Sequence, residues 1–220
     1  MLNDIINLWS KYHQVYIEGV IGTLWMSLIV VVLGTLVGAL LALGQRSRFK
    51  VIRGIVNCYV EIFRGTPLLL QMWLFVYGGA IYTGNTFDET FWVICALIVN
   101  SSAYVTEIFR AGLQAVDKGQ FEAAQSLGMS RSNMMRKIIL PQAIKNILPA
   151  LGNEFVTMIK ETSIASVFFV TSLMTSQSIV NSATHLSIAS LIIVGSLYFV
   201  LTFISSRLVK FAERKLIEND

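Results

Sequence analysis

The sequence has little charge, since only 14% of its 220 residues are Asp, Glu, Lys or Arg, whereas 55% are apolar. Soluble domains carry roughly 25% charged residues, so water is not the main solvent of this chain. Cysteine is nearly absent, and Cys58 and Cys95 lie in apolar segments without C-x-x-C or zinc-type spacing. We therefore interpret both as small core residues and expect neither a disulfide framework nor a metal site.

Motifs for catalysis and nucleotide binding are also missing. The chain has no G-x-x-x-x-G-K-[ST] loop, so it is not expected to use ATP by P-loop chemistry. It has neither H-E-x-x-H nor G-x-S-x-G, which argues against an intramembrane enzyme. No clear internal repeat or filter motif is present, which disfavours a self-sufficient transporter or channel. The net charge of +4 is divided among separate loops, so we do not expect nucleic acid as a partner.

Long uncharged segments dominate instead. Residues 20–43 form a run of 24 without Asp, Glu, Lys or Arg. As a helix this run measures about 36 Å, enough to cross a hydrocarbon core of about 30 Å. Three more uncharged windows follow, and the last, residues 162–206, has 45 residues and is too long for one crossing. It must turn inside the membrane or at its edge.

The basic residues predict the topology. They gather in residues 46–53, 110–145 and 207–215, which should be cytoplasmic by the positive-inside rule. Parity then predicts an all-α integral membrane protein with five transmembrane helices, its N-terminus outside and its C-terminus cytoplasmic. The expected crossings are residues 20–43, 55–81, 90–109, 146–168 and 185–206. The Ser- and Thr-rich residues 169–184 would form an outer loop or a re-entrant piece.

The first residues lack a basic n-region, so we expect no cleaved signal peptide. Aromatic and apolar side chains at helical spacing predict that residues 1–18 form an extracytoplasmic helix on the membrane surface. A transmembrane domain would occupy residues 19–213, and a cytoplasmic tail residues 214–220.

The loop between the third and fourth crossings, residues 119–143, is long, basic and amphipathic. Residues 122–124 favour a helix, Gly128 interrupts it, and residues 130–139 resume it before Pro141 stops it. Two short helices joined by a glycine turn suit docking into a partner's groove, where Leu127 and Met129 would be buried. From the residues alone, a solvated or membrane-surface loop is an equally good interpretation.

This loop resembles the signature loop of ABC importer permeases, with Glu-Ala-Ala at 122–124, Gly at 128 and Ile-x-Leu-Pro at 138–141. The segments RGTPLLLQ at 64–71 and LPQA at 140–143, and Ser-Ala-Tyr at 102–104, are similar to the polar amino-acid permease subfamily of the histidine, glutamine and arginine type. The resemblance covers roughly residues 17–213. Ala111 and Glu161 are small departures outside the loop.

The resemblance implies a type I ABC importer permease of the bacterial cytoplasmic membrane that forms the pathway for a polar or charged L-amino acid. Two permease chains, identical or paired, would form the pathway in the lipid, and an extracytoplasmic binding protein would deliver the amino acid. Two ABC ATPase subunits would carry ATP and Mg, and this chain would hold no cofactor. The implied ATPase-coupling residues are Glu122, Ala123, Ala124, Leu127, Gly128 and Met129.

Charges inside the membrane indicate the pathway, because an ionisable group at mid-bilayer costs several kcal/mol unless it pairs or faces water. The fourth crossing is the least apolar and should face the pathway or the partner chain. We expect Glu154 to accept the substrate ammonium, and Asn100, Ser101, Ser102 and Thr157 to donate to its carboxylate. An equally good interpretation pairs Glu154 with a basic neighbour and uses the hydroxyls to join helices. The predicted pathway residues, chosen by depth, are Thr66, Leu68, Asn100, Ser101, Ser102, Glu154, Thr157 and Met158.

Two i, i+3 pairs, Glu61 with Arg64 and Glu107 with Arg110, are predicted to be structural ion pairs. Thr66 and Pro67 are predicted to kink the second crossing, because proline removes a helical hydrogen bond.

Overall fold

The computed structural model of the protein describes residues 1–84 and 86–217, and all regular structure in these residues is helical. Residues 218–220 of the predicted tail lie outside the described residues. In chain order the α-helices are α1 Leu2–Gln45, α2 Lys50–Gly65, α3 Leu68–Thr83, α4 Glu89–Gln114, α5 Lys118–Ser126, α6 Arg131–Met134, α7 Leu140–Glu161, α8 Leu173–Thr184 and α9 Ser187–Ile217. A π-helical segment, Met135–Ile139, joins α6 to α7, and a 3₁₀ segment, Thr162–Phe168, follows α7.

Three helices among the described residues, α1, α4 and α9, are long and apolar enough to cross a membrane. A fourth span would come from residues 131–168 together with α8, a pair bent by 43°. The crossing predicted at 55–81 corresponds to the separate helices α2 and α3. The count of five crossings and the orientation of the termini stay predictions.

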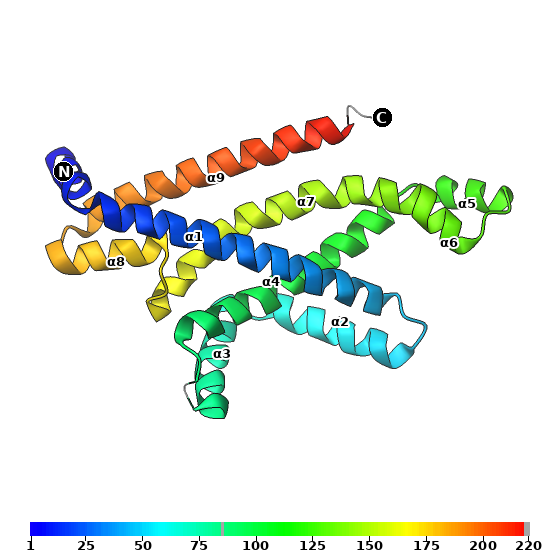
Figure 1. The fold of residues 1–220 in the computed structure, drawn as a ribbon, viewed down its shortest axis with the longest axis horizontal. Coiled ribbons are helices and arrows are strands. Elements are labelled where there is room, and N and C mark those ends of the chain that lie inside the picture. Colours follow the sequence, from blue (N-terminus) through cyan, green and yellow to red (C-terminus); the bar gives the residue numbers. More distant parts are fainter. Residues whose placement is uncertain (85, 218–220) are drawn as a thin grey trace.

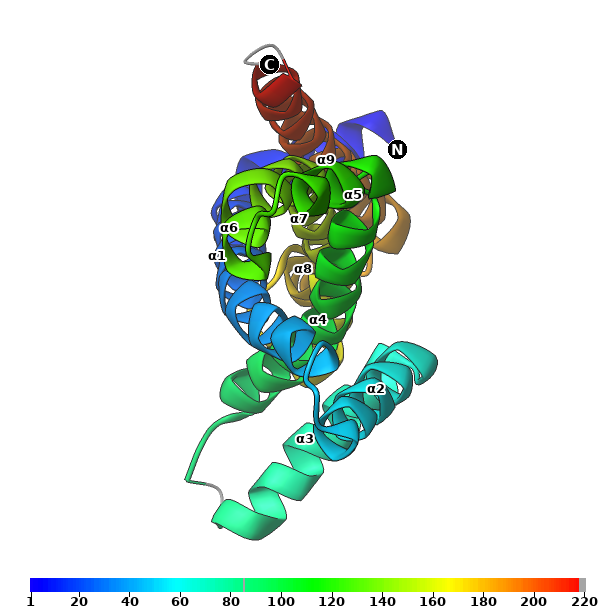
Figure 2. The ribbon, with the colours of Figure 1, turned by 90° about the vertical axis from the view of Figure 1, so that its right-hand side faces the viewer.

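Helix α1 lies across α4 and α7, and α5 and α6 sit at the end of α7 that is remote from the N-terminus (Figure 1). Seen from that end, α2 and α3 lie on one side of the molecule (Figure 2), where both pack against α4. Gly38 permits the close approach of α1 to α4, because a Cβ there would lie 2.8 Å from the Ser102 carbonyl oxygen. The Thr106 hydroxyl also donates to the Gly38 carbonyl, at 3.3 Å.

The second predicted crossing is broken rather than kinked. Thr66 and Pro67 are both extended, with ψ of 149° and 133°, and α3 turns away from the direction of α2 (Figure 1). The physical reason is steric, because a proline disfavours the α region for the residue before it. Pro67 itself is extended, so the helix cannot resume until Leu68.

The prediction that Pro141 ends the loop helix is wrong. Pro141 stands in the first turn of α7, directly after the π segment Met135–Ile139. In this segment the Leu140 N–H donates to the carbonyl of Met135, five residues back. The helix is continuous from Arg131 through Pro141, and the wide π turn before the proline accommodates its ring and its missing N–H.

The stretch predicted as an outer loop or re-entrant piece contains α8, which packs against the first half of α1. The Leu173 N–H donates to the Thr23 hydroxyl at 2.9 Å, and the Ser176 hydroxyl donates to the Val15 carbonyl at 2.8 Å. Helix α1 runs unbroken through residues 18 and 19, where the sequence predicts a boundary. The location of residues 1–18 on the membrane surface stays a prediction.

Candidate functional site

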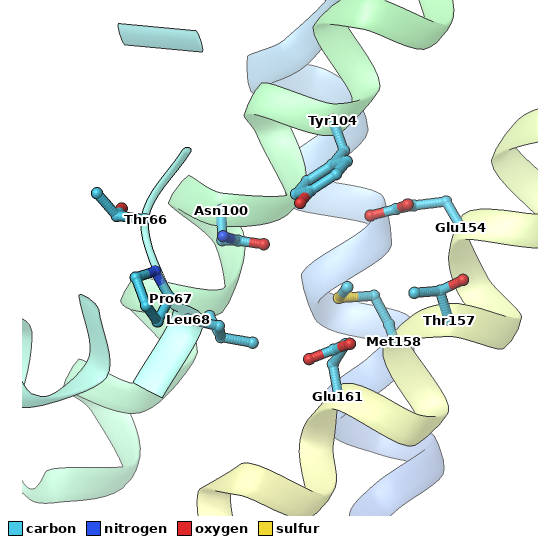
Figure 3. Close-up of a pocket in the computed structure, with 9 residues that line it drawn as sticks. All are labelled: Thr66, Pro67, Leu68, Asn100, Tyr104, Glu154, Thr157, Met158 and Glu161. Atoms are coloured by element: carbon cyan, nitrogen blue, oxygen red, sulfur yellow. The ribbon is translucent and has the colours of Figure 1, made fainter. Parts of the chain in front are cut away.

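A cavity of about 330 Å³, called the central cavity below, opens between the α2–α3 break, α4 and α7 (Figure 3). Six of the eight predicted pathway residues line it, and the serines 101 and 102 are fully buried in α4 behind its wall. The lining residues are Thr66, Pro67, Leu68, Asn100, Tyr104, Glu154, Thr157, Met158 and Glu161.

Glu154 is buried, with 8% of its surface exposed, and its carboxylate points into the central cavity (Figure 3). Its Oε1 accepts a hydrogen bond of 2.9 Å from the Ser101 hydroxyl. Within the described residues Glu154 forms no ion pair, so the interpretation that pairs it with a basic neighbour does not describe this structure. A carboxylate held by one hydroxyl at a cavity wall retains acceptor capacity for a ligand.

The sequence interpretation missed Glu161 and Tyr104 as lining residues. Glu161 follows Glu154 by seven residues, which places both on one face of α7. The central cavity therefore contains two carboxylates, while its lining contains no Lys or Arg. The helical spacing of Glu154, Thr157, Met158 and Glu161 could have predicted that Glu161 lines the same wall. Tyr104 lies in the Ser-Ala-Tyr segment that carries the family resemblance, and could have been found from it.

The donors expected to bind a substrate carboxylate are engaged inside the protein. The Asn100 Nδ2 atom donates to the Phe63 carbonyl and to Gln71 Oε1, at 3.1 and 3.0 Å. The hydroxyls of Ser101, Ser102 and Thr157 donate to Glu154, Val99 and Asn153, respectively. The Asn100 side-chain oxygen points into the central cavity, so Asn100 presents an acceptor there (Figure 3).

Gln71 explains how the break between α2 and α3 is tolerated. A helix end leaves carbonyl groups without intrahelical partners, which is costly where water is scarce. The Gln71 Nε2 atom donates to the carbonyls of Phe63 and Thr66, at 2.9 and 3.1 Å, and Asn100 also donates to Phe63. The predicted pathway residue Asn100 thus also holds the wall of the cavity in place, together with Gln71, whose role the sequence does not reveal.

The predicted Glu61–Arg64 ion pair is wrong, and the predicted Glu107–Arg110 pair is confirmed. Arg110 Nη2 lies 2.6 Å from Glu107 Oε2, and Arg64 Nη1 lies 3.4 Å from the same oxygen. Arg64 ends α2 beside α4, where its guanidinium lies 5.3 Å from the centre of the Tyr104 ring. Contact with α4 therefore decides the partner of Arg64, which the spacing along α2 cannot reveal.

The loop between α5 and α6 is a turn that needs glycine. The Gly128 N–H donates to the Gln125 carbonyl at 2.9 Å, and the Met129 N–H donates to the Ala124 carbonyl at 3.1 Å. These two bonds, with Gly128 at φ +68°, form a Schellman motif. Leu127, at the end of α5, is left 80% exposed.

The other predicted coupling residues divide between surface and core. Glu122 and Ala123 are exposed on α5, whereas Ala124 is buried and Met129 packs against the same cluster. This cluster joins α5, α6 and the start of α7 through buried side chains, namely Val116, Ala124, Met134, Ile139, Ala143 and Ile147. Leu127 is therefore the apolar side chain that a partner would meet, whereas Met129, which was expected to dock beside it, packs against the cluster and supports the turn from inside.

Comparison with known proteins finds a family model described as "Binding-protein-dependent transport system inner membrane component", which matches residues 31–218. A putative glutamine transport system permease protein of Rickettsia conorii is 39% identical over 219 residues, and the match covers 100% of both chains. An arginine transport system permease protein of Bacillus subtilis is 40% identical over 204 residues, 93% of each chain. A solved structure described as an amino acid ABC transporter with histidines superposes with a TM-score of 0.89, at 45% identity, and covers 94% of this chain and 96% of that chain.

Proposed function

Because the chain belongs to the family of binding-protein-dependent transport system inner membrane components, we propose that it is the permease subunit of an ATP-driven importer for a polar or charged L-amino acid. It is a multi-pass protein of the bacterial inner membrane. The proposed complex contains a second permease chain, two ATPase subunits that bind ATP and Mg, and an extracytoplasmic binding protein. This chain forms the pathway and transmits the movement of the ATPases to it.

The central cavity is the observation that carries the substrate side of the proposal. Two carboxylates, Glu154 and Glu161, meet there without a Lys or Arg in the lining, so the field inside favours a cation. An amino-acid ammonium bound at Glu154 gains a charge-assisted hydrogen bond. Glu161 then favours a substrate with a second positive charge on its side chain, as arginine, lysine or protonated histidine carries.

The substrate carboxylate needs a donor that is not already engaged. Within the described residues the Tyr104 hydroxyl makes no hydrogen bond, and Tyr104 lines the central cavity opposite Glu154. A phenolic hydroxyl donates well to a carboxylate. Tyr104 and Glu154 therefore fix the two ends of the amino-acid backbone, and Glu161 selects the side chain.

The loop around Gly128 supports the coupling part of the proposal. Leu127 presents an apolar knob, exposed at the end of α5, that fits a groove on a partner. The buried cluster beneath it ties α5 and α6 to α7, the helix that carries Glu154 and Glu161. When the ATPases close on ATP, a rigid loop of this kind shifts α7 and changes the side to which the pathway opens.

Reconstitution into proteoliposomes tests the proposal. The complex of this chain with its ATPase and binding protein is assayed for ATP hydrolysis and for uptake of labelled L-arginine, L-histidine and L-glutamine. We expect uptake only with ATP and the ATPase, and we expect Leu127→Asp to lose ATPase assembly while the shape-conserving control Leu127→Met keeps it. Uptake that persists without any ATPase contradicts the importer assignment.

The substrate role of Glu154 has its own test in the same vesicles. We expect Glu154→Gln to assemble and to lose uptake of all three amino acids, because its neutral amide no longer pairs with the ammonium. A Glu154→Gln or Glu154→Ala complex that transports at the normal rate removes Glu154 from the substrate site.

A further inference from the structure

A second cavity, called the lateral cavity below, has a volume of about 350 Å³ and lies between the ends of α1 and α2 and the second half of α4. The proposed function does not use it. Its lining is mostly polar and charged and consists of Gln45, Asn57, Val60, Glu61, Arg64, Glu107 and Arg110.

Helix α2 supplies a polar stripe to this cavity. Lys50, Arg53, Asn57, Glu61 and Arg64 recur every three or four residues, so they share one face of the helix. Polar side chains are expensive against lipid and are expected to face water or a partner. The C-terminal part of the stripe, from Asn57 to Arg64, lines the lateral cavity, which indicates that this cavity is hydrated.

The acidic and basic side chains around the lateral cavity are not paired one to one, because both arginines pair with the same carboxylate. Glu107 forms ion pairs with both Arg64 and Arg110, and the Gln45 Nε2 atom donates to Glu107 Oε1 at 3.5 Å. Glu61 has no ion-pair partner in residues 1–84 and 86–217, although Arg64 lines the same cavity one turn away. The Gln45 Oε1 atom is buried and has no hydrogen-bond partner in that part of the chain.

These groups complement a zwitterion. An α-amino acid carries a carboxylate and an ammonium on one carbon, and both fit between a guanidinium and a carboxylate that face one space. We propose that the lateral cavity is a second amino-acid site, in which Arg64 binds the α-carboxylate and Glu61 binds the α-ammonium. This inference rests on the proposed function, because the lateral cavity would be the binding site that receives the substrate from the central cavity.

The two cavities share a wall formed by Tyr104 and Arg64. Tyr104 lines the central cavity, Arg64 lines the lateral cavity, and the guanidinium lies 5.3 Å from the ring centre. A substrate carboxylate in the central cavity is repelled by Glu154 and Glu161 and attracted by Arg64. A shift of the Tyr104 ring away from Arg64 therefore lets the substrate pass to the lateral cavity.

The position of the lateral cavity fits a release step. Its α4 residues, Glu107 and Arg110, follow Tyr104 along α4 in the direction of α5, so its α4 wall lies nearer to α5 than the α4 wall of the central cavity does. The α5–α6 side is the predicted cytoplasmic side, where an imported amino acid leaves.

Equilibrium binding of labelled L-arginine and L-glutamine to the purified, nucleotide-free complex tests this inference. We expect two binding sites per chain in the wild type. Glu61→Gln and Arg64→Gln should each weaken one site about tenfold or more, since a charge-assisted hydrogen bond is lost. Glu154→Gln should weaken the other site. Arg53→Gln, on the same helix but outside the cavity lining, is the matched control and should keep both.

A transport assay separates a binding role from a structural one. Glu61→Gln and Arg64→Gln should lower amino-acid uptake per ATP hydrolysed while the ATPase rate persists. The inference is overturned by a single site in a wild-type complex that transports, by variants that bind both amino acids as the wild type does, or by variants that no longer co-purify with the second permease chain, since the cavity is then an interface between chains. A wild-type complex without ATP-dependent uptake of any tested amino acid instead contradicts the proposed function.

Discussion

Substitution of Gly128 should loosen the loop between α5 and α6 by an amount that follows from its backbone alone. Gly128 has φ +68°, and a Cβ at this position would meet nothing within 4 Å. The cost of Gly128→Ala is therefore conformational, about 1–2 kcal/mol for an L-residue in the left-handed region. Gly128→Asn should cost less, because asparagine adopts this conformation more readily.

The expected readout is local opening of the turn. A cost of about 1–2 kcal/mol raises the opening equilibrium about 5- to 30-fold. Hydrogen exchange of the Met129 amide, which donates to the Ala124 carbonyl, should accelerate by that factor in Gly128→Ala and by less in Gly128→Asn. Uptake per ATP hydrolysed should fall in the same order, from glycine through asparagine to alanine.

Two results would refute this reasoning. Exchange of the Met129 amide at the wild-type rate in Gly128→Ala would mean that the turn does not depend on a left-handed residue. Equal loss of coupling in Gly128→Ala and Gly128→Asn would mean that the side chain, rather than the backbone, disturbs the docking surface.

Three other changes have expected outcomes. Gln71→Leu should destabilise the complex by about 1–3 kcal/mol for each carbonyl left without its partner at the α2–α3 break, measured as a lower melting temperature in detergent; an unchanged melting temperature would mean that water replaces the amide. Gly38→Ala should also lower the melting temperature, because the new Cβ would lie 2.8 Å from the Ser102 carbonyl oxygen. Gly54→Ala is the control: a Cβ there meets open space, so the melting temperature should rise slightly. Glu161→Gln should reduce uptake of L-arginine more than uptake of L-glutamine in proteoliposomes; equal reduction would remove Glu161 from side-chain selection.

The sequence predicts the cavity better than it predicts the backbone around it. Glu154, Thr157 and Met158 share a helix face and stand at one estimated depth, so periodicity and hydropathy were enough to bring them to one wall. The break after α2 was underestimated, because a proline signals a bend but only the local dihedral angles decide between a kink and an interruption.

Partners across helices are the part that a single sequence does not contain. Arg64 forms its ion pair with Glu107 on α4, not with Glu61 on its own helix. The Asn100 amide donates to the Phe63 carbonyl and to Gln71 Oε1. Each choice depends on the distance between helices that are far apart in the chain. The predicted roles of Asn100 and Arg64 differed from the structure for that reason, although both residues line cavities.

The π-helical segment before α7 sets the angle at which the loop meets its partner. Each residue of an α-helix turns the chain by about 100°, and the π turn in Met135–Ile139 takes up one residue more than an α turn does. If the same residues were wound as a regular α-helix, α5 and α6 would therefore rotate by about that angle around the axis of α7. Leu127 would then point toward another quarter of the molecule with its own turn intact. The wide turn itself, more than the identity of its residues, should therefore be kept among permeases of this length that share one ATPase.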